Sequence, residues 1–220
     1  METIKKTTLS FLSSLKKNND REWFRKNQAL YADAKNNFET LMQEIINKII
    51  DFEPIIKGLE VKNCVYRINR DIRFSNDKSP YKSHFGAFIV RGGKKNGDKF
   101  AGYYIHIEPG SSILAGGAYM PPSPWLAAIR EKIDQESVLF NKIINQKDFI
   151  KYFGHLDGEK LKTPPRGYTS DNPNIELLKF KSYLVVNEVP DKLVISPDYF
   201  EHVIKVLKSM KPLNDFVNEY

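Results

Sequence analysis

Apolar residues recur every three or four positions through the first fifty residues of the chain, which is the period of an amphipathic helix. The pattern runs longest from Leu30 onward and predicts one long helix that Pro54 and Gly58 end. Residues 9–15 predict a shorter helix before it, and Asp20 is placed to cap a second one. The N-terminal part of the chain is therefore predicted to be helical.

The period changes from 3.6 to two between residues 61 and 118, where β-branched and aromatic residues are frequent. Because Gly-rich stretches separate several of these segments, we expect an antiparallel meander. The stretch 92–97 predicts a hairpin loop whose lysines point into solvent. The predicted strands are 61–68, 85–90, 100–107 and 112–118.

Helix signals return in the second half of the chain. Ser123 is placed to cap a helix whose first position Pro124 occupies. Asn-Pro at 172–173 and Ser-Pro at 196–197 repeat this start signal, and residues 183–186 between them predict a further strand. Helical segments thus flank a central run of strands.

This order of elements predicts an α+β fold: a single domain over residues 1–220, with a central antiparallel sheet and with N-terminal and C-terminal helices packed on it. Hydrophobic residues make up 41% of the chain and aromatic residues 12%, which is enough to build a sizeable core. The composition therefore excludes a disordered chain and a small disulfide scaffold.

The sequence also bears on location. No apolar run approaches the roughly 20 residues that span a bilayer, so no membrane association is predicted. The first twenty residues are too polar for a signal peptide, and Cys64 is the single cysteine. We expect a cytoplasmic protein in which Cys64 is a buried bystander.

The positive charge of the chain is concentrated in one region. The formal net charge is +7, and residues 62–99 hold ten basic and three acidic groups, so the remainder of the chain is balanced. A polyanion coat would need basic residues spread along the chain. One local cationic region is therefore the better interpretation.

The most unusual stretch within this region is 65–88. An extended chain places Arg67, Asp71 and Arg73 on one face, where Asp71 can hold an arginine fork and leave positive charge for an anionic ligand. Turn-forming residues at 75–80 predict that the chain folds back. The residues expected to return near the arginines are Lys78, Tyr81, Lys82 and His84.

Three functions fit this segment. The favoured function is binding of a small molecule that carries a phosphate or carboxylate group, because the arginines and lysines outnumber the local carboxylates. Alternatively, an arginine–aspartate network only stabilises the sheet of a structural or interaction protein. A nucleic-acid-binding module is the third reading, with Tyr66, Phe74 and Tyr81 available for base stacking.

The same segment carries a recognisable motif, R-x-x-R-D-x-R-F-x-x-D-K-x-x-Y-K, from Arg67 to Lys82. Together with GYYIHIEPG at 102–110 and LKTPPRGY at 161–168, it resembles the domain of unknown function 2461 family of uncharacterised proteins. The resemblance implies a mostly bacterial, single-domain cytoplasmic protein. It implies no established activity and no catalytic residue.

Strand alternation adds a second set of polar groups, with Tyr104, His106 and Glu108 on one face. His106 and Glu108 suit a base and its orienter, or two ligands of a metal ion. Since the other histidines show no metal-ligand spacing, neither a metal nor a cofactor is predicted. No nucleophile–base pair is evident, so enzymatic activity stays open. The candidates for proton transfer are Tyr81, His84, His106 and Glu108.

A stiff Pro-Pro loop at 161–168 presents Arg166, either as part of a binding site or in a loop that closes a gap over the core. The residues expected to bind the anion are Arg67, Arg70, Asp71, Arg73, Lys78, Tyr81, Lys82 and Arg166.

Overall fold

The computed structural model describes residues 2–73 and 76–219. It begins with the helices α1 (Lys6–Lys17), α2 (Arg21–Lys26) and α3 (Gln28–Ile49). The predicted cap of the second helix is confirmed, because the Asp20 carboxylate accepts a hydrogen bond of 2.8 Å from the backbone N–H of Trp23. The long helix ends at Ile49, before Pro54 and Gly58.

Within the described residues, four strands form one antiparallel sheet in the order β1-β2-β3-β4. Ile105 of β2 pairs with Leu114 of β3, and Ala115 of β3 pairs with Val186 of β4. The strands are β1 (Phe85–Ile89), β2 (Gly102–Ile107), β3 (Ser112–Ala118) and β4 (Tyr183–Val189). The short 3₁₀ helices are η1 (Pro54–Ile56), η2 (Val61–Asn63) and η3 (Lys94–Asn96). The predicted meander is confirmed for the segments that form β1, β2 and β3.

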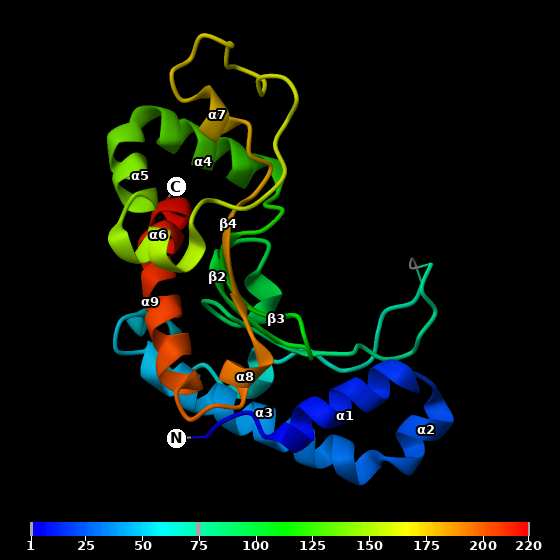
Figure 1. The fold of residues 1–220 in the computed structure, drawn as a ribbon. Helices are drawn as coiled ribbons and strands as arrows, with labels where there is room; N and C mark the ends of the chain where they lie inside the picture. The colour runs from blue at the N-terminus through cyan, green and yellow to red at the C-terminus, as the bar shows by residue number, and fades with distance from the viewer. Residues whose placement is uncertain (1, 74–75, 220) are drawn as a thin grey trace.

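The C-terminal half is mostly helical. Its first helix starts one residue earlier than predicted, so that Ser123 is the first helical residue and does not cap the helix through its side chain. The helices are α4 (Ser123–Gln135), α5 (Ser137–Ile144), α6 (Lys147–Phe153), α7 (Ile175–Leu178), α8 (Asp191–Val194) and α9 (Tyr199–Asn218). Figure 1 shows the N-terminal helices at one end of the sheet and α4 to α7 at the other.

The core lies between the sheet and the long helices. In Figure 1, α9 runs along one face of the sheet, where it contacts β3, while α3 contacts β1. Tyr103, Ile105 and Ile107 of β2 are buried on this face. Tyr104 and His106 alternate with them on the other face and are only partly buried. The fold is α+β, as predicted, and it leaves the polar face of β2 partly exposed.

The predicted strand over 61–68 is wrong. Val61–Asn63 form a 3₁₀ helix, and only isolated bridges pair Val65 with Ala87 and Asn69 with Tyr81. The reason is local, because the N–H groups of Cys64 and Val65 both donate to the carbonyl oxygen of Val61, at 2.9 and 3.0 Å. Backbone groups used in this way cannot join a sheet ladder.

The loop at 92–97 differs from the predicted hairpin loop with both lysines in solvent. It contains η3, and Lys94 does not extend into solvent: its Nζ donates a 3.0 Å hydrogen bond to the carbonyl oxygen of Lys62. Lys95 is exposed, as predicted. None of the helices in the described parts of the chain has the length and apolar character needed to cross a bilayer.

Candidate functional site

Residues 65–73 and 76–84 lie side by side, and these two segments, here called the basic hairpin, bring the cationic side chains together. Its two sides are joined by backbone hydrogen bonds from Arg70 N to Pro80 O at 2.9 Å and from Lys82 N to Ile68 O at 2.8 Å. The chain therefore folds back as the turn residues predict. In Figure 1 the basic hairpin projects from the sheet on the side away from α9.

Carboxylates of the basic hairpin neutralise Arg70 and Arg73. Asp71 holds the Arg73 guanidinium by both oxygens, at 2.9 Å to Nε and 2.6 Å to Nη2. These hydrogen bonds hold the pKa of Asp71 well below its usual range. Arg70 pairs with Asp77, which the sequence analysis did not assign to it, and donates to the Ser79 hydroxyl at 3.1 Å. Part of the predicted arginine–aspartate network is thus present.

Unlike Arg70 and Arg73, Arg67 and Lys82 form no salt bridge within the described residues. Arg67 is exposed and makes no hydrogen bond or salt bridge to another described residue. The half-buried Lys82 ammonium lies 5.3 Å from the centre of the Tyr66 ring and, within the described chain, has no carboxylate partner. Burial, together with the charges of Arg67 and Arg70, lowers the pKa of Lys82. Arg67 and Lys82 therefore add positive charge that no salt bridge within the described residues neutralises.

A second set of polar groups lies beside these cations, on the exposed face of β2. The Tyr104 hydroxyl is 3.0 Å from Nδ1 of His106, and Nε2 of His106 is 3.2 Å from Oε2 of Glu108. The predicted shared face of these residues is confirmed. Burial raises the pKa of Tyr104 to about 12, so its hydroxyl keeps its proton at neutral pH.

The other oxygen of Glu108 is fixed by separate parts of the chain. Oε1 accepts hydrogen bonds from the Ser83 hydroxyl at 2.8 Å and from Lys16 Nζ of α1 at 3.2 Å. Burial acts to raise the pKa of Glu108, but the hydrogen bonds from Ser83, His106 and Lys16 outweigh it and lower the pKa. Glu108 is therefore a positioned, ionised carboxylate.

His84 completes this set. Its ring centre lies 4.1 Å from that of His106, and in the described residues its nitrogens have no hydrogen-bond partner. Burial and the neighbouring His106 lower the pKa of His84 to about 4. Among the described residues, one nitrogen from each histidine and one Glu108 oxygen lie within 4.8 Å of one another. The sequence analysis predicted no metal set because it did not place His84 beside His106.

The register of the sheet explains why the two histidines meet. Gly86 of β1 pairs with His106 of β2, and His84 directly precedes β1. A methyl group on Gly86 would come within 3.0 Å of the Tyr104 hydroxyl, so glycine leaves room for Tyr104 to reach His106. The sequence shows Gly86 and His106 but not that they pair, so it holds no signal that places the two histidines together.

The remaining predicted residues lie elsewhere or have other contacts. The Tyr81 ring is buried and stacks on Phe24 at 4.0 Å, so the core holds it. Lys78 donates to the carbonyl oxygen of Ile72 at 3.0 Å. Arg166 belongs to the loop between α6 and α7, at the far end of the sheet from the basic hairpin (Figure 1), so the structure does not bring it to the cluster. Phe74 lies outside the described residues.

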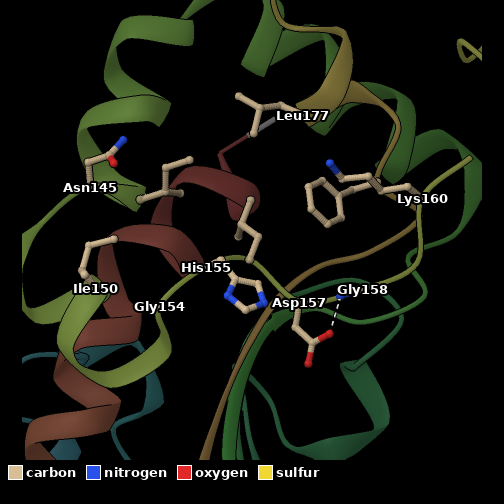
Figure 2. Close-up of a pocket in the computed structure, with 11 residues that line it drawn as sticks. Asn145, Ile150, Gly154, His155, Asp157, Gly158, Lys160 and Leu177 are labelled. Atoms are coloured by element: carbon tan, nitrogen blue, oxygen red, sulfur yellow. Dashed lines mark hydrogen bonds between the residues drawn. The ribbon is translucent and has the colours of Figure 1, made fainter.

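A separate hollow of about 510 Å³ lies between α5, α6 and α7 (Figure 2). Its charged groups engage neighbours instead of converging. Asp157 accepts a hydrogen bond of 2.6 Å from the backbone N–H of Gly158, and Lys160 lies 4.7 Å from the Phe180 ring centre. The hollow therefore lacks the convergent chemistry found beside the basic hairpin.

The fold and these side chains define the class: an α+β protein built on an antiparallel sheet, with a cationic hairpin and a histidine–glutamate cluster beside its first two strands. Within that class, the chain belongs to the family described as conserved hypothetical protein (DUF2461), whose sequence model matches residues 7–216. The family resemblance noted from the motifs is thereby confirmed. Comparison with curated proteins and with solved structures gave no match.

Proposed function

We propose that the protein binds a small molecule carrying a phosphate or carboxylate group, and that Arg67, Arg70 and Lys82 form the anion site. The observation that carries this proposal is the lack of a carboxylate partner for Arg67 and Lys82 within the described chain, although Lys82 is half-buried. A half-buried ammonium beside two guanidinium groups, of which only that of Arg70 has a carboxylate partner, is unfavourable unless a further anion joins them. Binding an anion relieves this repulsion.

The purely structural alternative accounts for only part of the basic hairpin. A network that merely stabilises the sheet needs the pairs Arg70–Asp77 and Arg73–Asp71, and it gives no role to Arg67 or Lys82. Arginine forks and a lysine together suit phosphate and carboxylate oxygens, because each oxygen accepts more than one charged hydrogen bond.

The nucleic-acid alternative is less well supported, because it needs aromatic rings free to stack on bases. The Tyr81 ring is committed to the stack with Phe24, and Lys82 covers the Tyr66 ring. A compact site for a small anion therefore agrees better with these contacts than an open groove does.

The test is calorimetric titration of the protein with inorganic phosphate and, separately, with citrate. Wild type is expected to bind at least one of them, and Arg67→Ala and Lys82→Ala are each expected to lower the affinity about tenfold, since a charge-assisted hydrogen bond contributes about 1.5–3 kcal/mol. Lys95→Ala is the matched control, because Lys95 is an exposed cation of the same charged region but lies in η3. The Lys95→Ala variant should bind phosphate and citrate with the affinity of wild type.

Two results would overturn the proposal. One is binding that Arg67→Ala and Lys82→Ala leave unchanged. The other is no binding of either anion, together with binding of a single-stranded oligonucleotide that weakens steeply between about 50 and 200 mM salt, as backbone binding does. The second result would favour the nucleic-acid alternative.

A further inference from the structure

We propose that His84, His106 and Glu108 bind a divalent transition-metal ion of the Zn²⁺ class, next to the anion site. This is a second site with its own ligands. Imidazole nitrogens suit Zn²⁺ and related ions, and three protein ligands with one open position are typical of zinc sites that act on a further ligand. The donor set of two nitrogens and one carboxylate oxygen is of this kind.

The three groups are in the protonation states that metal binding requires. Burial lowers the pKa of both His84 and His106, so both rings are neutral at neutral pH, while Glu108 is ionised. Neutral imidazole and carboxylate are the ligand forms of these side chains.

Other side chains already form hydrogen bonds with two of the proposed ligands, His106 and Glu108. Tyr104 contacts Nδ1 of His106 and leaves Nε2 facing Glu108, and the Tyr104 oxygen can accept a hydrogen bond from Nδ1–H once Nε2 binds a metal. Ser83 and Lys16 hold Oε1 of Glu108, while Oε2 contacts Nε2 of His106 at 3.2 Å, and a metal ion bound to both of these atoms would replace that contact. Metal ligands usually have such outer hydrogen bonds, which fix their orientation.

The geometry is close to that of an occupied site. The candidate ligand atoms lie within 4.8 Å of one another. Ligand atoms bound tetrahedrally at about 2.0–2.2 Å to one ion lie about 3.3–3.6 Å apart, so movements of about 1–1.5 Å suffice. His84 has no hydrogen bond to break within the described residues, and rotation of its ring can supply this movement.

Cations nearby oppose a second positive charge, and this links the two sites. Arg70 and Lys82 lie close enough for their charges to lower the pKa of His84, so a metal ion alone also meets their repulsion. An anion held by these groups removes the repulsion and can fill the open position on the metal. This coupling rests on the proposed function, whereas metal binding itself does not. Sulfate and the metal should each raise the affinity for the other.

The experiment is titration of the metal-free full chain with zinc chloride in sulfate-free buffer, followed by cobalt(II) absorption in the visible range as a measure of coordination. Wild type should bind one equivalent, and His84→Ala and Glu108→Gln should each lower the zinc affinity at least tenfold. Circular dichroism verifies that the variants fold. His155→Ala is the matched control, because His155 is exposed and lies by the separate hollow near α6 (Figure 2); its zinc affinity should be unchanged.

Zinc binding that is absent from wild type, or that both ligand variants retain in full, would overturn the metal site. Adding sulfate distinguishes a failure of the metal site from a failure of the anion site. Sulfate should raise the zinc affinity of wild type several-fold, and Arg67→Ala should bind zinc while losing most of the sulfate effect. Zinc binding that sulfate leaves unchanged would overturn the coupling and leave the metal site standing.

Discussion

Asn19 holds the backbone of Tyr81 by two hydrogen bonds: its Nδ2 donates to the carbonyl oxygen at 2.9 Å, and its Oδ1 accepts from the N–H at 3.0 Å. Asn19 lies between α1 and α2, so this contact ties the N-terminal helices to the returning side of the basic hairpin. Tyr81 immediately precedes Lys82. The position of the cations therefore depends on a residue that carries no charge.

Replacing Asn19 with alanine is expected to weaken both the fold and the proposed anion site. Loss of the two hydrogen bonds should lower the free energy of unfolding by about 1–2 kcal/mol. Phosphate affinity should fall several-fold, since the returning side of the hairpin is less fixed. Urea unfolding and phosphate titration measure the two effects.

Asn18→Ala serves as the control, because the exposed Asn18 side chain makes only a local hydrogen bond to Ser14 O at 2.9 Å. It should leave phosphate affinity unchanged. Equal phosphate affinities for Asn19→Ala and wild type would show that the Tyr81 contact does not position the site.

The elements with regular periodicity could be predicted from the sequence. Alternation along 112–118 marks β3 with its bounds, and the three-to-four spacing after Leu30 marks α3, because in both cases one face is buried and the other is not. Residues 61–68 were misjudged, since Val61, Val65 and Ile68 favour a strand while local backbone hydrogen bonds form a 3₁₀ turn at the start of the segment.

The candidate site was less predictable, because its contacts depend on register. The sequence shows Asp71 near Arg73, and the structure pairs them. The pairing of Gly86 with His106, which brings His84 to the same place, follows from how β1 lies against β2 and has no local sequence signature.

Replacing Asp71 with asparagine is expected to strengthen anion binding. The change removes the carboxylate that holds the Arg73 guanidinium and a negative charge that acts on Arg67. Because Asp71 is exposed, the melting temperature should stay close to that of wild type. Phosphate titration should show an affinity about two- to fivefold higher.

A structural role for this pair predicts the opposite pattern. Asp71→Asn would then lower the melting temperature and leave phosphate affinity as it is. Asp98→Asn is the matched control, because Asp98 is an exposed carboxylate in the same charged region of the sequence and lies just after η3.

Asn37 makes the largest set of buried polar contacts near the N-terminus. Its Oδ1 accepts from Lys5 N at 2.9 Å and from the Thr8 hydroxyl at 2.8 Å, and its Nδ2 donates to Glu2 and Thr3. Asn37→Ala leaves buried partners unsatisfied and should lower the free energy of unfolding by about 2–4 kcal/mol in urea titrations.

The neighbouring Asn36 provides the control, since it is exposed on the same helix and its side chain makes no hydrogen bond to another described residue. Asn36→Ala should change stability by less than about 0.5 kcal/mol. If both alanine variants unfolded at the same urea concentration, the buried contacts of Asn37 would have no net stabilising effect.

Cys64 is expected to make the fold less stable in alkaline solution. Its side chain is buried, and its thiol makes a weak 3.7 Å hydrogen bond to Glu60 O. Burial raises the pKa of Cys64 from 9.0 to about 11. Between these values the unfolded chain has lost the thiol proton and the folded chain has kept it, so the free energy of unfolding falls as pH rises.

One pKa unit corresponds to about 1.4 kcal/mol, so the contribution lost between pH 9 and 11 is about 2 kcal/mol. Buried tyrosines also titrate at high pH, and Cys64→Ala separates their effect from that of the thiol. The stability of wild type relative to Cys64→Ala should be constant from pH 7 to about 8 and should decline above pH 9. If the difference in stability between wild type and Cys64→Ala stayed constant up to pH 11, the thiol would ionise equally in the folded and unfolded chains. Burial of Cys64 would then not raise its pKa, and the prediction would be wrong.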